Sequence, residues 1–311
     1  MRTVLILLCL ALVTVGAAYA LLDPERRSLD DAARADAPGS FVRLTDGVTH
    51  YSVSGPDTGP VVVLAAGFSV PYYIWDPLPR ALADSGFRVV RYDYFGRGWS
   101  DRPPGPYDQP MFVRQLGELL DSLGVREPVG LAGLSFGGAI ITSFADAYPE
   151  RVSSLIYVDP CFIRPSPLPF RRRSAAAWNA YMVLGGGTDE LATGQLFDFL
   201  HPERHPDWVT RYRVQQQFRG TRAAIRASHL AIAAGPDQRD QLRRVAAHPR
   251  PVLVIWGRED RVIPFAESDS LLAIFNHAEF VPVDSAAHLP HLEQPDTVAG
   301  AVVRFLRTVP D

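Results

Sequence analysis

The stretch GLAGLSFGGAI, residues 130–140, decides the fold expected of this chain. A serine stands between two glycines, after the apolar run PVGLAGL and before FGGAIITSFADAY, which has helical spacing. Ser135 is therefore expected on a sharp turn from a buried strand into a helix. Glycines at 133 and 137 permit a strained backbone that exposes the serine. We interpret Ser135 as a catalytic nucleophile rather than a serine in a tight turn, and a nucleophile needs a base, an orienting acid and oxyanion donors.

The base is sought among the 8 histidines of the chain. Only His288 and His291 follow the last expected strand, AEFVPV, and precede the last expected helix. That loop lies at the same sheet edge as Ser135, so a histidine there can take the serine proton. His288 is preferred because it comes first after the strand, and His291 is expected to begin the helix or line the pocket.

The orienting acid is expected between the serine and the histidine in chain order. Asp260, in WGREDRVIP, comes just after the apolar run PVLVIW and is the preferred residue. Glu259 and Asp159, at the end of LIYVD, are the competitors.

Two backbone N–H groups are needed to stabilise an oxyanion. One is expected from Phe136, the residue after the nucleophile, and the other from Phe68 in the loop AAGFSVPYY. Gly67 permits a close approach of the backbone to the substrate.

The rest of the chain predicts an α/β fold with a mostly parallel, doubly wound sheet. Short apolar runs alternate with helical stretches, after a hairpin turning at Asp46-Gly47. Residues 160–236 interrupt this pattern with proline-dense and then helical sequence, so we expect a helical cap inserted between core segments 41–159 and 237–311. Aromatic and apolar cap residues are expected to form the core of the cap or to line an acyl pocket: Phe162, Phe170, Trp178, Tyr181, Met182, Leu184, Phe197 and Phe199.

The N-terminus predicts export. Residues 1–22 form an apolar segment that is either a membrane anchor or a signal sequence cleaved near Ala20, and residues 23–40 form a polar linker. A net charge of −3 offers no broad basic surface for nucleic acid, and 2 cysteines exclude a disulfide framework. Arg171–Arg173 are interpreted as a solvated basic corner, with attraction of anionic lipid as the alternative.

Together these residues resemble the α/β-hydrolase fold superfamily, over about residues 41–308. RYDYFGRGWSDRP, GREDRVIP and HLPHLEQP are similar to its loop after the fourth strand, its acid motif and its histidine motif. Capped serine hydrolases, such as monoacylglycerol lipase-like esterases and meta-cleavage-product hydrolases, are the most similar branch. The resemblance implies a Ser135–Asp260–His288 triad, an acyl pocket shaped by the cap, and no metal or organic cofactor. Two departures are Ala66 before Gly67, where histidine is common, and Ala287 before His288, where glycine is usual.

A serine hydrolase acting on a small-molecule ester or lipid is the function expected. The alternatives are a C–C bond hydrolase with the same triad, which needs an arginine such as Arg97 to hold a carboxylate, and a non-catalytic ligand-binding protein that retained the fold. Nucleic acid is not an expected partner, and association with a membrane would use residues 4–22.

Overall fold

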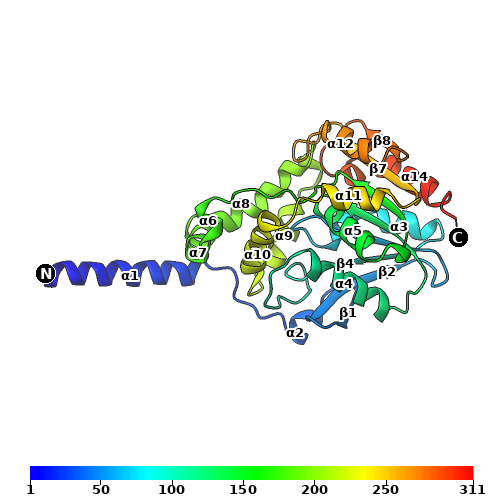
Figure 1. Ribbon diagram of the computed structural model, residues 1–311. Coiled ribbons are helices and arrows are strands. Elements are labelled where there is room, and N and C mark those ends of the chain that lie inside the picture. Colours follow the sequence, from blue (N-terminus) through cyan, green and yellow to red (C-terminus); the bar gives the residue numbers. More distant parts are fainter. Residues whose placement is uncertain (311) are drawn as a thin grey trace.

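The computed structural model describes residues 1–310 and contains an eight-stranded sheet in the order β1-β2-β4-β3-β5-β6-β7-β8 (Figure 1). The antiparallel hairpin β1–β2 begins the sheet, β2 pairs antiparallel with β4, and all later neighbours are parallel. The strands are β1 (Ser40–Arg43), β2 (Val48–Ser54), β3 (Val61–Ala65), β4 (Arg88–Tyr92), β5 (Val129–Leu134), β6 (Val152–Val158), β7 (Val252–Gly257) and β8 (Glu279–Val283). The expected fold class is confirmed.

The central strands are buried because both faces of the sheet are covered. Every residue of β5 and β7 is buried, which explains their near-continuous apolar sequence. In register, Leu64 of β3 lies beside Ala132 of β5, and Leu131 of β5 beside Leu155 of β6.

Helices cover the two faces in separate layers. In one layer α3 (Leu78–Asp84) packs against α14 (Pro295–Leu306), while in the other α5 (Phe136–Ala147) packs against α4 (Gln109–Ser122) and α11 (Arg239–Ala246). The short helices α12 (Glu267–Ile274) and α13 (Pro290–Glu293) follow β7 and β8. The carboxyl ends of β5, β6, β7 and β8 therefore meet at one sheet edge, where the loops carry the candidate site.

The segment 160–236 is mainly helical and lies at one end of the sheet (Figure 1). Its helices are α6 (Phe170–Arg173), α7 (Ala175–Leu184), α8 (Gly187–Thr193), α9 (Trp208–Gln216) and α10 (Thr221–Ala234). We call this segment the cap.

The N-terminal helix α1 (Arg2–Leu22) projects from the body with none of its residues buried (Figure 1). It is long and apolar enough to cross a membrane. The following segment, expected as a polar linker, packs against the body: Arg27 forms a backbone bridge with Phe218, and the short helix α2 (Asp31–Arg34) ends at the buried Arg34.

Candidate active site

Ser135 lies on the turn between β5 and α5, in a conformation that ordinary residues avoid. Its backbone angles are φ 52° and ψ −120°, and its side chain is partly exposed. The turn is fixed by the Ser135 N–H, which donates to Val158 O at 3.0 Å, and by the Ser135 carbonyl, which accepts from Gly138 at 2.9 Å and Cys161 at 2.8 Å. Such strain persists only where neighbours enforce it and is typical of functional positions.

The glycines around Ser135 are required by close backbone packing. A Cβ on Gly137 would lie 2.3 Å from the carbonyl oxygen of Ala65, and one on Gly133 would lie 2.5 Å from the Gly137 backbone. Gly67 differs, because a Cβ there would meet the Ser135 Cβ at 3.7 Å, an ordinary contact. Glycine at 67 therefore leaves space beside the serine rather than avoiding a collision.

The structure brings His288 and Asp260 together. The His288 Nδ1 lies 2.8 Å from Asp260 Oδ2, and both side chains are buried. The other carboxylate oxygen of Asp260 accepts the N–H groups of Val262 at 2.7 Å and Ile263 at 2.9 Å. Since Asp260 engages Nδ1, the Nε2 nitrogen of His288 is left to act as a base.

The backbone contacts of Ser135 connect its turn to the sheet edge that carries this pair. The Ser135 N–H is hydrogen-bonded to the Val158 carbonyl, and Asp159 follows Val158 in the chain. A side-chain oxygen of Asp159 lies within 4.8 Å of a carboxylate oxygen of Asp260 and a ring nitrogen of His288. Across residues 1–310 the Ser135 hydroxyl makes no hydrogen bond. Nucleophile–base bonds in free enzymes often form only when substrate is bound.

Asp159 is a second buried carboxyl, with a different environment. Its Oδ1 accepts the Gly257 N–H at 2.9 Å, while its Oδ2 has no partner among the described residues. Burial, with the negative charge of Asp260 next in importance, raises the pKa of Asp159 well above its usual value. The two acids therefore differ in their contacts, because Asp260 is hydrogen-bonded to His288 and to two backbone N–H groups, whereas Asp159 accepts only the Gly257 N–H among the described residues.

The same three side chains are close enough to hold a metal ion. However, the 2.8 Å bond between His288 Nδ1 and Asp260 Oδ2 already pairs two of the possible ligand atoms with each other. The donor set therefore fits proton transfer better than metal binding.

The backbone N–H groups of Phe68 and Phe136 are both free of protein acceptors within residues 1–310. Phe136 is the first residue of α5, where N–H groups have no partner inside the helix. The two rings meet edge to face, with centroids 5.8 Å apart.

Arg97 holds the loop that carries Phe68 by a hydrogen bond to its backbone. Its Nε donates to the Phe68 carbonyl at 2.9 Å, its Nη2 to the Ser228 hydroxyl at 2.9 Å, and its Nη1 to the Phe95 carbonyl at 3.3 Å. The side chain is completely buried, and burial lowers the pKa of Arg97 to about 10. Arg97 thus holds backbone and cap groups, rather than facing the pocket as the C–C hydrolase alternative requires.

His291 takes no part in the proton path. Its Nε2 bonds the Ile74 carbonyl at 2.6 Å, its ring packs on Trp75, and burial lowers its pKa to about 4. It fastens the histidine loop to the segment that follows Phe68.

Glu293, which sequence reasoning did not single out, joins the cap to the histidine loop. Its Oε2 accepts the N–H of Ala287, beside His288, at 2.7 Å. Its Oε1 accepts the N–H groups of Leu200 at 2.8 Å and His201 at 3.0 Å in the cap. The only signal in the sequence was its place in HLPHLEQP.

Asp198, in the cap, completes this junction and was also missed. The backbone N–H of His288 donates to the backbone carbonyl of Asp198 at 3.0 Å. Burial raises the pKa of the Asp198 carboxyl to about 6. An acidic cap side chain is therefore held next to the candidate base.

The proposed pocket residues lie in two places. Trp178 is buried with Met182 and Ile225, and Phe68 and Tyr181 pack against this cluster, so these aromatic side chains lie over the oxyanion loop. The Tyr181 hydroxyl donates to Glu190.

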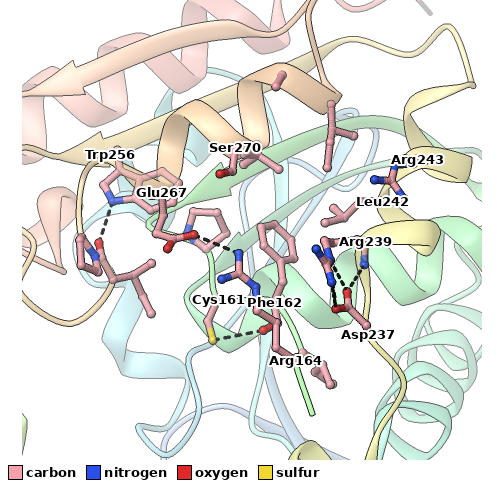
Figure 2. Close-up of a pocket in the computed structure, with 17 residues that line it drawn as sticks. Cys161, Phe162, Arg164, Asp237, Arg239, Leu242, Arg243, Trp256, Glu267 and Ser270 are labelled. Atoms are coloured by element: carbon pink, nitrogen blue, oxygen red, sulfur yellow. Dashed lines mark hydrogen bonds and ion pairs between the residues drawn. The ribbon is translucent and has the colours of Figure 1, made fainter. Parts of the chain in front are cut away.

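Phe162 lines a separate groove of about 860 Å³ (Figure 2). Its walls include Trp256 and Leu242, and a 3.0 Å ion pair joins Arg164 and Glu267 at it. Ser135, Asp260 and His288 do not line this groove.

Comparisons with known proteins find matches over most of the chain. A family model described as alpha/beta hydrolase fold matches residues 60–295. Lipase 1 of Psychrobacter immobilis is 24% identical over 252 residues, covering 80% of this chain and 77% of the lipase. The 2-hydroxymuconate semialdehyde hydrolase of Pseudomonas putida is 30% identical over 229 residues, covering 70% of this chain and 76% of that protein. A solved esterase from Thermogutta terrifontis, with malate bound, has a TM-score of 0.74 and 27% identity, covering 87% of this chain and 99% of its own.

Proposed function

This chain belongs to the alpha/beta hydrolase family and is a hydrolase, and we propose that it cleaves carboxylic esters of apolar or lipid-like substrates through an acyl-enzyme. The observation that carries the proposal is the 2.8 Å bond between His288 and Asp260, at the sheet edge that also holds the strained Ser135. The names of relatives, a lipase and an esterase, support the ester bond.

In the proposed reaction the Ser135 hydroxyl attacks the ester carbonyl while His288 Nε2 takes its proton. Asp260 holds the imidazole in the required tautomer and stabilises the imidazolium. The N–H groups of Phe68 and Phe136 bind the oxyanion. His288 then protonates the leaving alcohol, and the same steps with water release the acid and restore Ser135.

The second candidate reaction is C–C bond hydrolysis with the same three residues. The 30% identity with the 2-hydroxymuconate semialdehyde hydrolase favours it. The engagement of Arg97 inside the protein weighs against it, because no donor of Arg97 is presented as a clamp for a substrate carboxylate. Ester hydrolysis therefore remains the leading proposal.

The proposed cellular location is supported by the apolar helix α1. We propose that the catalytic body lies outside the cytoplasm, either released after cleavage near Ala20 or anchored by α1, and we favour the anchored form.

The test uses the full chain in detergent, with p-nitrophenyl esters from acetate to laurate. Wild type is expected to turn over and to react with a fluorophosphonate probe, whereas Ser135→Ala does neither while keeping the wild-type circular dichroism spectrum. Folded wild type that is silent on every ester would end the ester proposal. The series would then be repeated on a dienone substrate.

A further inference from the structure

The segment after α1 is fastened to the cap by a partly buried ion pair. Arg222, near the start of α10, donates to the two carboxylate oxygens of Asp23 at 2.8 and 3.2 Å, and its Nε donates to Asn179 of α7 at 3.0 Å. Only 11% of the Arg222 side chain is exposed. A two-point, partly buried ion pair of this kind contributes more to stability than an exposed surface ion pair does.

A second acidic residue strengthens this attachment. The Glu25 carboxylate accepts the N–H of Gly220 at 3.0 Å and the N–H of Arg222, so it caps the first turn of α10. Backbone bonds add to it, because Arg27 donates to Gln217 at 3.0 Å and accepts from Arg219 at 2.9 Å. We call the contacts of Asp23, Glu25 and Arg27 with the cap the anchor clamp.

The anchor clamp holds the C-terminal end of α1 against the cap. With 21 residues, α1 is about 32 Å long at 1.5 Å per residue, close to the thickness of a bilayer core of about 30 Å. Its C-terminal part contacts α7, and it projects from the cap end of the body (Figure 1). If α1 spans a bilayer, the surface of that bilayer reaches the cap first.

The cap surface next to α1 has the composition of a membrane interface. The helix α6 packs on α7 beside α1, and it presents Phe170, which is 68% exposed, together with the exposed Arg171 and Arg173. At the end of α1, Arg26 donates to the carbonyls of Asp23 and Ala20. Aromatic and basic side chains at the end of a span favour the headgroup region and anionic lipid.

The cap surface next to α1 is also connected to the candidate site. Trp178 of α7 donates its indole N–H to the Arg222 carbonyl at 3.0 Å, and its cluster packs against Phe68 of the oxyanion loop. One layer of side chains therefore separates the anchor clamp from the oxyanion loop.

We infer that the α6–α7 face of the cap docks on an anionic lipid bilayer spanned by α1, so that the site receives lipid-borne esters from that membrane. The substrate class rests on the proposed function, whereas the docking does not. Arg171 and Arg173 contact lipid phosphates, and Phe170 enters the headgroup region.

Docking is tested without reference to activity. The full chain, with Cys9→Ser and Cys161→Ser, is reconstituted in phosphatidylcholine–phosphatidylglycerol vesicles with a fluorophore at Phe170→Cys. The control is Glu127→Cys, which lies at the opposite edge of the sheet from Ser135. Brominated lipids are expected to quench position 170 and not position 127. Equal quenching, no quenching, or a membrane-isolated protein whose mass lacks residues 1–20 overturns docking.

The substrate class is tested by charge reversal. Arg171→Glu with Arg173→Glu is compared with Arg239→Glu with Arg243→Glu, a pair of exposed arginines on α11. Each α6 arginine is expected to contribute roughly fivefold to the rate on an ester in anionic vesicles and nothing to the rate on a soluble ester. The α11 pair should leave both rates unchanged. Equal losses in the two variants overturn delivery from the membrane, while inactivity of wild type on all esters overturns the proposed function and leaves the quenching result standing.

Discussion

Asp260→Asn separates the proposed role of this carboxylate from simple packing. The asparagine oxygen can keep the bonds from Val262 and Ile263, so the loop is expected to hold its shape. The amide NH₂ then faces His288 Nδ1, which must become an acceptor. The imidazole proton moves to Nε2, and the base can no longer take the proton of Ser135.

The expected loss in kcat is about 10³- to 10⁴-fold, or about 4–5 kcal/mol of transition-state stabilisation. KM should change little, because Asp260 is buried behind His288 and does not contact substrate in the proposed reaction. The melting temperature should stay near that of wild type. The assay is steady-state hydrolysis of p-nitrophenyl butyrate, with melting followed by circular dichroism.

Asp159→Asn is the matched control, since it makes the same change in the same cluster. Asp159 accepts one hydrogen bond, from the Gly257 N–H, and the amide oxygen of asparagine can keep that bond. Burial raises the pKa of Asp159, so replacing its carboxyl with a neutral amide of similar shape is a mild change. The expected change in kcat is less than about tenfold, because among the described residues Asp159 makes no hydrogen bond to His288. If Asp159→Asn loses more activity than Asp260→Asn, the roles of the two acids are reversed and our reasoning is refuted.

Three further predictions address the surroundings of the site. Gly137→Ala places a Cβ 2.3 Å from the Ala65 carbonyl and is expected to cost about 3 kcal/mol or to prevent folding, whereas Gly194→Ala, with nothing within 4 Å, should melt like wild type. Glu293→Gln loses the charge of the bonds on both sides of the junction and should lower kcat about tenfold. The KM for a soluble substrate should change by a smaller factor. For Asp198 the folded-state pKa of about 6 lies above the ordinary value of 3.8, so the folded chain retains a proton that the unfolded chain releases, and stability falls as pH rises from about 4 to 6. Asp198→Asn should therefore raise the free energy of unfolding by about 2–3 kcal/mol at pH 8 and leave it unchanged at pH 4, as measured by urea unfolding; equal effects at both pH values would contradict the shift.

Local pattern was enough to predict the sheet. The hairpin around Asp46-Gly47 and the later strands were readable because turn residues and apolar runs act over a few residues. The neighbourhood of His288 and Asp260 was also predictable, since parallel strands bring their carboxyl ends to one edge.

The remaining features depend on contacts between distant residues. The Glu293 carboxylate reaches Leu200, 93 positions away, and the Arg97 guanidinium reaches Ser228, 131 positions away. A glutamate at the end of a short helix and an arginine in a glycine-rich loop have the same local sequence whether or not such partners exist. The attachment of residues 23–27 to the cap was missed for the same reason, because the polar composition of this segment equally suits a free linker.

The junction at Glu293 has a mechanical consequence. The cap is joined to the core covalently near residues 160 and 236, and the Glu293 and Asp198 bonds add an attachment in its middle. A segment held at both ends and at points between them, including the bond from Arg97 to Ser228, resists swinging as one rigid lid, since such a motion would break charge-assisted bonds beside His288. Opening is therefore confined to the parts between attachments, above all the arm α6–α8. The cap and the histidine loop should also lose hydrogen-exchange protection as one cooperative unit.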